Sequence, residues 1–513
     1  MFGTAVTAAI CGIESKRITV EADVSDGLPM FTMVGYLSSE VREAQERVRT
    51  ALKNSGFRLL PKRVTINLAP ADIRKEGSGF DLPIAVAVLT AYGYLPQDAL
   101  EGVFFAGELS LNGEINGIHG IMSMAAAALE CGCHTCIIPM ANRMEGAVIQ
   151  GIRVLGASNI SEVINFFTSN GKLTETHINI EEILSEQENS YSVDFAEIQG
   201  QEVLRRGAEV AVSGMHNLLI IGPPGVGKSM IAQRIPTILP PLGIEEALEI
   251  SKIHSIAGVL PEGKGIMTTR PFRAPHHTIT RTALAGGGRV PRPGEVSLAH
   301  HALLYLDELP EFQKDTLEIL RQPLEDGQVC IARNTGTYIF PADFMLVASM
   351  NPCKCGYYPD RNRCSCSIRE VKRYLDHISQ PLLDRMDICV EAAPVSYMEL
   401  SSGRKGESSA DIRKRVVKAQ KIQQKRYAGT EVKFNAGLKT SEIKKYCYLG
   451  KTEESLMKET FEKLQLSGRA YHRILKVART IADLDEKDQI GVLHLKEAIC
   501  YRSLDKKYWG GNF

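Results

Sequence analysis

The feature that most constrains this chain is an aliphatic run followed at once by a glycine-rich turn, LLIIGPPGVGKS at residues 218–229. Four consecutive apolar residues before turn residues are typical of a buried strand. Gly222, Gly227, Lys228 and Ser229 then satisfy the pattern G-x-x-x-x-G-K-[ST], and a helical pattern follows. The spacing predicts a strand, a phosphate-binding loop and a helix, which together begin a parallel α/β sheet.

The residue types of this loop match the chemistry of a bound nucleotide. Glycines allow backbone N–H groups to turn inward around phosphates, while Lys228 reaches the outer phosphates and the Ser229 hydroxyl joins the shell of a Mg²⁺ ion. We therefore expect ATP and Mg²⁺ as ligands. The expected nucleotide-binding residues are Gly222, Pro223, Pro224, Gly225, Val226, Gly227, Lys228 and Ser229.

A second apolar run, ALLYLDE at 302–308, ends in two adjacent carboxylates. Two acids after a strand are most often a solvated strand end. Beside a phosphate loop they fit a catalytic pair, in which Asp307 holds Mg²⁺ and Glu308 orients and polarises the attacking water. The combination of the two motifs favours the catalytic interpretation.

Further polar residues fit the same chemistry. Asn351 ends a third apolar run, FMLVASMNP at 344–352, where its amide could touch the γ-phosphate or the water. Arg385 could neutralise charge in the transition state from a neighbouring subunit, although an ordinary ion-paired arginine is the alternative. Arg469 and Arg473 are four residues apart and share one helix face, from which they could report the nucleotide state.

The length of 513 residues indicates several domains. Residues 1–167 alternate β-rich and helical runs and predict an α/β domain, and the polar segment 168–190 predicts a linker with a short helix. Residues 191–395 contain the three apolar strands and predict a parallel α/β core. Residues 396–513 are mostly helical in pattern.

Net charge and hydropathy bear on the partners and the cellular location that we expect for the chain. Sixty basic residues balance sixty acidic residues, so attraction to nucleic acid must come from local patches. No apolar run is long enough to span a membrane, and the N-terminus lacks the pattern of a secretory signal. The expected location is the cytoplasm, where thiols stay reduced.

The order of the motifs resembles an AAA+ ATPase, and six strings resemble its magnesium-chelatase-like branch, the ComM/YifB family. These strings are GMHNLLIIGPPGVGKSMIA, RPFRAPHHTITRTALAGGG, PRPGEVSLAHHALLYLDELPEF, LRQPLEDGQVCIARN, MNPCKCGYYPD and LSGRAYHRILKVARTIADL. The resemblance covers nearly the whole chain. It implies Asn351 as sensor 1, Arg385 as the arginine finger, Arg469 as sensor 2, a helical lid and a hexameric ring.

Four cysteines, Cys353, Cys355, Cys364 and Cys366, lie within NPCKCGYYPDRNRCSCS at 351–367. Their spacing alone permits disulfides or one metal cluster. In a reducing compartment four thiolates suit tetrahedral Zn²⁺, and the similar cysteine motif of the resembled family supports this expectation. Free reduced cysteines are the alternative to a structural zinc loop over 353–366.

The resemblance also implies DNA as the partner, because ComM-like proteins are similar to ring helicases that drive branch migration during natural transformation. Residues 404–426 carry nine basic and two acidic residues, which suits sequence-independent phosphate contacts or a solvated face. The resemblance places pore loops at 282–294 and 324–340, where Arg333 stands beside Asn334. A chelatase-type or protein-remodelling motor that does not act on DNA is the alternative.

The N-terminal domain has a resemblance of its own. Residues 107–128 and 75–89 resemble segments of the Lon protease domain, but Met122 and Met124 stand where that domain has lysines. Ser78 and Lys75 fall outside the expected register for a serine–lysine pair. We therefore expect a binding or assembly module with a protease-like fold, and proteolysis is the weaker alternative.

Overall fold

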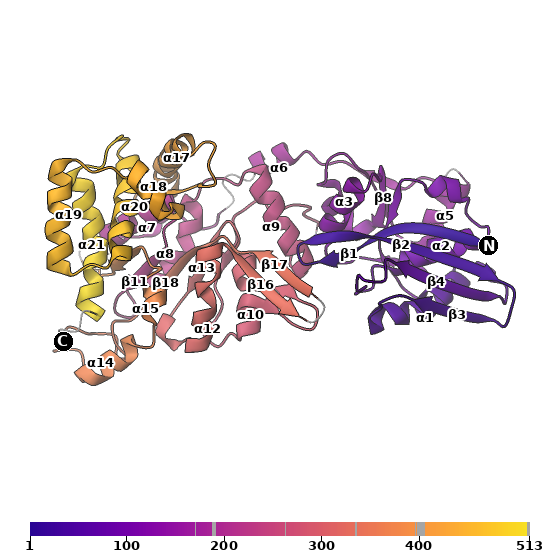
Figure 1. Ribbon diagram of the computed structural model, residues 1–513, viewed down its shortest axis with the longest axis horizontal. Helices are drawn as coiled ribbons and strands as arrows, with labels where there is room; N and C mark the ends of the chain where they lie inside the picture. Colours follow the sequence, from indigo (N-terminus) through magenta and orange to yellow (C-terminus); the bar gives the residue numbers. More distant parts are fainter. Residues whose placement is uncertain are drawn as a thin grey trace.

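The computed structural model describes residues 1–169, 171–186, 191–261, 263–333, 336–395, 397 and 406–509. Three parts follow one another along the long axis: an N-terminal α/β domain, a central α/β core and a C-terminal group of helices (Figure 1). None of the described helices is long and apolar enough to cross a membrane. The mixed α/β class and the helical C-terminal region predicted from the sequence are confirmed.

The N-terminal domain is built on an eight-stranded mixed sheet in the order β10-β9-β8-β5-β1-β2-β4-β3. β4 alternates buried and less buried residues along RVTINLA, because one face packs on helices, whereas β5 and β8 are buried along their whole length. The strands are β1 (Phe2–Cys11), β2 (Glu14–Ser25), β3 (Met30–Val34), β4 (Arg63–Ala69), β5 (Val103–Phe105), β8 (Thr135–Pro139), β9 (Arg153–Ala157) and β10 (Thr174–Thr176), with a separate pair β6 (Glu108–Leu109) and β7 (Ile115–Asn116).

The helices of this domain follow from their sequences. The Ser38 hydroxyl caps α1 by accepting the Val41 N–H, and α2 is apolar and buried on all sides against the sheet. The helices are α1 (Ser39–Asn54), α2 (Asp81–Ala91), α3 (Ile121–Glu130), α4 (Arg143–Ala147), α5 (Ile160–Thr168) and α6 (Ile180–Glu186).

The segment expected to be a linker contains more structure than its polarity indicates. The short helix α6 lies within it, as expected, and β10 pairs antiparallel with β9 at the edge of the N-terminal sheet. A three-residue edge strand exposes one face and carries little periodic signal. Residues 170 and 187–190 of this segment lie outside the described residues.

The core is a parallel sheet of five strands in the order β12-β15-β18-β11-β19. The strands are β11 (Leu218–Ile221), β12 (Phe272–Arg273), β15 (Leu303–Leu306), β18 (Met345–Met350) and β19 (Ile388–Glu391). The sequence predicts the middle three, whereas β12 has two residues and follows Pro271. Because β15, β18 and β11 are neighbours and parallel, their carboxyl ends meet at one edge.

Helices and two small hairpins surround this sheet. The hairpins, β13 (Gly286–Gly287) with β14 (Arg292–Pro293) and β16 (Gln328–Arg333) with β17 (Gly336–Pro341), fall in the two predicted pore segments. Asn334 lies outside the described residues. The helices are α7 (Glu202–Gly214), α8 (Lys228–Arg234), α9 (Ile244–Ala257), α10 (Arg281–Ala285), α11 (Glu295–Leu298), α12 (Lys314–Glu318), α13 (Pro323–Asp326), α14 (Ile368–Leu375) and α15 (Gln380–Leu383).

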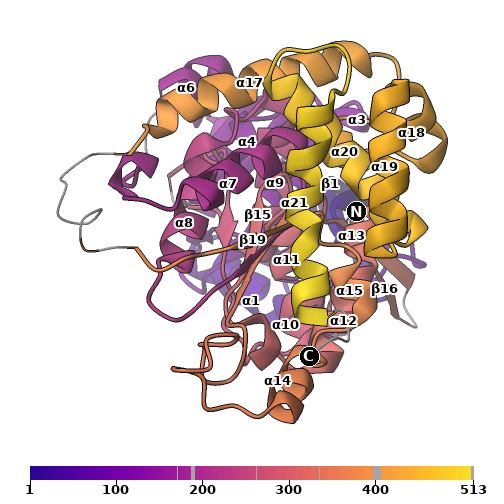
Figure 2. The same cartoon turned by 90° about the vertical axis from the view of Figure 1, so that its left-hand side faces the viewer.

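The C-terminal helices pack on one end of the core, and α21 runs across the front of the view in Figure 2. Buried amides attach α17 to α7, because Gln420 donates to the Val212 carbonyl at 3.0 Å and Gln423 to the Ser213 carbonyl at 2.8 Å. The helices are α17 (Ser409–Arg426), α18 (Thr440–Tyr446), α19 (Lys451–Leu464), α20 (Gly468–Leu484) and α21 (Val492–Trp509).

The N-terminal domain is attached to the core through α9. The buried Glu145 carboxylate accepts the Met122 N–H at 3.0 Å and also the hydroxyl of Ser255 on α9. The Gly120 N–H donates to the Ser255 carbonyl at 3.2 Å. Buried, satisfied polar groups specify this junction, because breaking them would leave a carboxylate unpaired.

Candidate functional site: a phosphate loop beside a four-cysteine loop

The predicted phosphate loop joins β11 to α8. Gly225 and Gly227 have φ angles of +79° and +88°, which only glycine adopts without strain. The Lys228 amine lies inside the loop and donates to the carbonyls of Gly222 at 2.8 Å and Pro223 at 2.9 Å. Burial lowers the pKa of Lys228, since the charged amine loses water there.

Lys228 also joins the loop to the third strand. Its amine donates to the Asn351 side-chain oxygen at 2.9 Å, at the end of β18. This contact places Asn351 beside the loop, where the sequence predicted a sensor for the terminal phosphate. The parallel order of β11 and β18 explains the proximity, because both chains leave the sheet at the same edge.

The two carboxylates after β15 lie at this edge. The Ser229 hydroxyl donates to Asp307 Oδ2 at 2.8 Å, and the Ser349 hydroxyl donates to the other carboxylate oxygen. Burial opposes ionisation of Asp307, but the hydrogen bonds from Ser349 and Ser229 outweigh it and keep the pKa of Asp307 below its ordinary value. An ionised carboxylate beside a hydroxyl is a ligand set that suits Mg²⁺.

Glu308 has an unusual backbone conformation. Its φ of +53° lies in the left-handed region, which is uncommon for a residue with a side chain. Its carboxylate lies 3.7 Å from Nδ1 of His277, and the rings of His276 and His277 are 4.0 Å apart. Strained backbone of this kind concentrates at functional sites.

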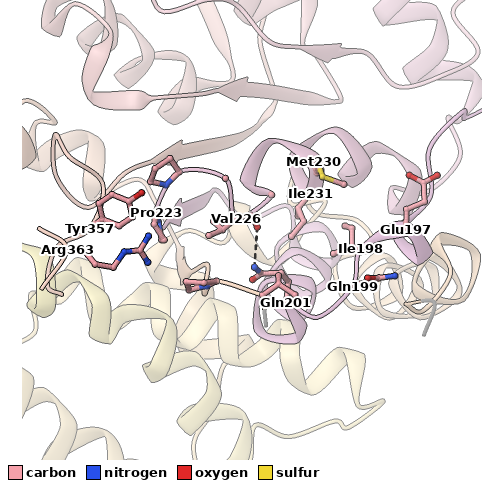
Figure 3. A pocket seen from close by; sticks show the side chains of 15 residues that line it. Glu197, Ile198, Gln199, Gln201, Pro223, Val226, Met230, Ile231, Tyr357 and Arg363 are labelled. Atoms are coloured by element: carbon pink, nitrogen blue, oxygen red, sulfur yellow. Dashed lines mark hydrogen bonds between the residues drawn. The ribbon is translucent and has the colours of Figure 1, made fainter. Parts of the chain in front are cut away.

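A cavity of about 350 Å³ opens along the phosphate loop. Pro223 to Gly227 line it together with Ile198, Gln199 and Gln201, which precede α7, and Gln201 lies beside Val226 (Figure 3). Gln201 donates to the Val226 carbonyl at 3.2 Å. The cavity is therefore a nucleotide-sized site that continues outward from the loop.

Arg385 and Arg469 do not line this cavity. They line a second one of about 460 Å³ with Arg473 and Lys476. Arg385 pairs with Glu325, and Arg469 lies 3.6 Å from Asp384 while its side chain is 71% exposed. The structure thus separates the predicted finger and sensor arginines from the phosphate loop of their own chain.

The four predicted cysteines converge. Cys353 Sγ lies 3.3 Å from Cys355 Sγ and 3.7 Å from Cys364 Sγ, and all four sulfur atoms lie within 4.8 Å of one another. A tetrahedral zinc site with bonds of about 2.3 Å places its sulfurs about 3.8 Å apart. The Tyr358 N–H also points at Cys353 Sγ, at 3.4 Å. The cluster is compatible with zinc, and its sulfurs are too far apart for disulfides.

The basic segment at 404–426 is less available to a partner than its charge indicates. Residues 404 and 405 lie outside the described residues, and at least four of the seven described cations pair with carboxylates. Arg415 pairs with Glu209 and Glu407, and Arg426 pairs with the fully buried Asp483. Arg415 and Arg426 therefore attach α17 to its neighbours through buried carboxylates.

The two predicted pore hairpins lie side by side and carry exposed arginines. Arg333 Nε donates to the Gly288 carbonyl at 3.3 Å, which joins the β16–β17 hairpin to the β13–β14 arm. Arg289, Arg292 and Arg333 are all exposed. We call these three residues the hairpin arginines.

The candidate protease residues of the N-terminal domain are not brought together as a pair. Lys75 is fully buried and donates to the Pro70 carbonyl, while Ser78 lines a separate cavity of about 500 Å³. Among the described residues no hydrogen bond joins Lys75 to Ser78. This arrangement does not supply the activated hydroxyl that a serine–lysine protease needs.

Sequence reasoning missed several residues of the site. Ser349 is two residues before Asn351, so strand periodicity could have placed both on one face. Tyr357 and Arg363 line the nucleotide cavity from inside the cysteine loop, and nothing in their local pattern indicates it.

Comparisons with known proteins agree with this architecture. Residues 194–400 match the family model described as magnesium chelatase, subunit ChlI, residues 20–142 match subunit ChlI of Mg-chelatase, and residues 406–502 match its C-terminal part. The core sheet, its phosphate loop and these matches define an ATPase of AAA+ type.

Full-length relatives narrow the class further. The uncharacterized protein YifB of Salmonella typhimurium is 42% identical over 503 residues, which cover 98% of this chain and 97% of that protein. The competence protein ComM of Haemophilus influenzae is 40% identical over 497 residues, 97% of this chain and 96% of that protein. The magnesium-chelatase 38 kDa subunit of Rhodobacter capsulatus is 23% identical over 176 residues, 31% of this chain and 50% of that protein. The chain belongs to the ComM/YifB family of magnesium-chelatase-like AAA+ ATPases, and this membership implies ATPase activity.

Proposed function

We propose that this protein is a cytoplasmic, hexameric ring ATPase that couples ATP hydrolysis to movement on DNA, with ComM-like branch migration of recombination intermediates as its task. The observation that supports ATP hydrolysis is the group of polar residues at the carboxyl edge of the core sheet, which we call the constellation. There Lys228 contacts Asn351 and Ser229 contacts Asp307, with Glu308 next in the chain. Polar residues that follow two other strands, β15 and β18, converge on the phosphate loop that follows β11.

Each residue of this constellation has a proposed role. Lys228 binds the outer phosphates, and Asn351 senses the terminal one. Ser229 and Asp307 would hold Mg²⁺, which neutralises phosphate charge when bound. Glu308 orients the attacking water and accepts its proton. The low pKa of Asp307 supports this assignment, since a metal ligand must be ionised.

Arg385 and Arg469 act on the nucleotide of a neighbouring subunit. Both line the second cavity, with Arg473 and Lys476 adding to its positive charge, and neither lines the cavity of their own phosphate loop. A guanidinium supplied across a subunit boundary stabilises the charge of the transition state. In this proposal hydrolysis requires the ring.

We also propose a structural zinc ion on Cys353, Cys355, Cys364 and Cys366. Support comes from the sulfur positions, because all four sulfur atoms lie within 4.8 Å of one another. Four sulfurs this close suit the tetrahedral coordination that zinc prefers. When bound, zinc supplies a cross-link for a loop that lacks an apolar core of its own.

The DNA contacts are assigned to the hairpin arginines. They are exposed, adjacent and carried by the two segments that the family resemblance places in the central pore. Arginines in such a pore bind phosphates without reading the sequence. The ion pairs of α17 make that helix the weaker candidate.

The test is ATP turnover by the purified protein with and without four-way-junction DNA, at two salt concentrations, followed by separation of strand products. The proposal expects salt-sensitive stimulation and junction processing. The triple variant of Arg289, Arg292 and Arg333 to alanine should lose stimulation and keep basal turnover. Alanine at the exposed Lys421 and Lys425 of α17 is the matched control and should change neither. Turnover indifferent to DNA would overturn the DNA motor and favour a chelatase-type or protein-remodelling client.

A further inference from the structure

The cysteine loop packs directly on the phosphate loop. Gly356, between Cys355 and Tyr357, has a φ of +88°, and a Cβ atom built on it would lie 2.6 Å from Cδ of Pro224. No side chain separates the two loops at this point. The position of the cysteine loop therefore sets the outer wall of the nucleotide cavity.

Two side chains of the cysteine loop face this cavity. Tyr357 and Arg363 line it together with Pro223 and Val226, and they lie at the opposite end from Glu197 and Gln199 (Figure 3). The guanidinium carbon of Arg363 lies 4.1 Å from the centre of the Tyr357 ring, so the aromatic face holds it in place.

The charge of Arg363 is available for a ligand. Among the described residues that line the cavity, Arg363 carries the only cationic side chain. The acidic residue of the lining, Glu197, pairs with Arg234. No carboxylate of the described chain forms an ion pair with Arg363. A planar guanidinium in this position suits a phosphate group, which it can bind through two hydrogen bonds.

We propose that Arg363, held on the Tyr357 ring, binds a phosphate group of the nucleotide in the phosphate loop, so that the four-cysteine loop is part of the nucleotide site. This inference rests on the proposed ATPase function. The Asp360 N–H donates to the Tyr357 carbonyl at 2.9 Å, and the Cys364 N–H donates to the Asp360 carbonyl at 2.8 Å. These bonds connect Cys364 to Tyr357, whose ring holds Arg363, so loss of a metal from the cluster weakens nucleotide binding.

The chain offers a matched control two residues away. Arg361 also lies over a tyrosine ring, that of Tyr358 at 5.1 Å, but it does not line the cavity. Arg361→Ala and Arg363→Ala therefore remove the same charge and the same kind of stacking from the same loop, and Arg361→Ala also removes a hydrogen bond to the Cys366 carbonyl. Only Arg363→Ala removes a charge from the nucleotide site.

The experiment measures displacement of a fluorescent ATP analogue from the full-length protein by ATP, ADP and adenosine, with bound metal quantified for each variant. Arg363→Ala should lower the affinity for ATP and ADP roughly 10- to 100-fold, as expected for lost charge-assisted hydrogen bonds, and leave the affinity for adenosine unchanged. Arg361→Ala should bind all three as the wild type does. Removing the metal with a chelator should lower the affinity of the wild type for ADP and have little further effect on the affinity of Arg363→Ala.

The outcomes separate this proposal from the ATPase assignment. If Arg363→Ala binds ATP like Arg361→Ala while Lys228→Ala binds poorly, the ATP site stands and the role of Arg363 is overturned. If Lys228→Ala also binds normally, the ATP site itself is misassigned. If Arg363→Ala loses metal, the binding comparison uses Arg363→Gln instead. Its uncharged side chain is long enough to pack on the Tyr357 ring. Wild-type affinity in metal-bound Arg363→Gln would overturn the proposal.

Discussion

Replacing Gly356 with alanine should disable the nucleotide site without removing any side chain that we assign to the nucleotide. The added Cβ would lie 2.6 Å from Cδ and 3.3 Å from Cγ of Pro224. Carbon atoms pack at about 3.5–4.0 Å, so one of the two loops must move by about 1 Å. A misplacement of about 1 Å at a catalytic centre can lower the rate roughly 100-fold.

The same substitution also destabilises the fold. A left-handed backbone costs a residue with a side chain about 1–2 kcal/mol, and overpacking typically adds about 1–3 kcal/mol. Gly429 offers the control, since its φ is +80° and an added Cβ would meet nothing within 4 Å. Gly429→Ala should cost only the backbone term, about 1–2 kcal/mol.

The assay compares ATP turnover and thermal unfolding of Gly356→Ala, Gly429→Ala and the wild type. We expect Gly429→Ala to unfold at a slightly lower temperature with normal turnover. Gly356→Ala should show the larger shift and a turnover reduced by up to about 100-fold. Equal turnover in the two variants would refute the reasoning, because it would show that the contact between Gly356 and Pro224 does not position the phosphate loop.

Three further predictions concern catalysis, metal and acid stability. Glu308→Gln should retain ATP binding and lose about 10²- to 10⁴-fold in phosphate release, and wild-type turnover would overturn the role of Glu308. Cys364→Ser and Cys366→Ser should lose bound zinc by elemental analysis, and unchanged metal content would remove the zinc proposal. Burial opposes ionisation of Asp387, but its contact with His216 and nearby cations lowers the pKa of Asp387 to about 2 from an ordinary 3.8. A carboxyl group with a lowered pKa stabilises the folded state at every pH above its ordinary pKa, here by about 2 kcal/mol. This stabilisation is lost as the pH falls from about 4 to about 2. Asp387→Asn should therefore be less stable at pH 7 and lose less stability on acidification, and identical acid unfolding of variant and wild type would contradict the assignment.

Contiguous motifs predicted the centre of the core correctly. The runs at 218–221, 302–306 and 344–350 are neighbouring strands, because each combines a buried apolar stretch with polar residues at its end. The edge strands β12 and β19 escaped prediction. β12 has only two residues, which is too short for a periodic signal. β19 is as long as β11 and β15, but it lacks a motif such as the phosphate loop or the carboxylate pair that marks the ends of those strands.

The functional sites, like the strands, were predicted in part from the sequence. Spacing along the chain places Lys228 and Ser229 on one turn, and the parallel order of the strands brings Asp307 and Asn351 to them. The four cysteines converge as their spacing suggested. Charge counting could not decide the role of α17, because the sequence does not reveal that Glu209 and Asp483, far along the chain, pair with its arginines.

The sequence by itself determined the family, the phosphate loop, the carboxylate pair and the cysteine cluster, since each depends on residues close together in the chain. Only the tertiary structure decided what surrounds them. It placed Arg385 and Arg469 in a cavity apart from their own phosphate loop, and it placed Arg363 of the cysteine loop in the cavity beside that phosphate loop. The physical reason is that loops without a repeating pattern take their positions from the surfaces they pack on, and those surfaces form only when distant segments fold together.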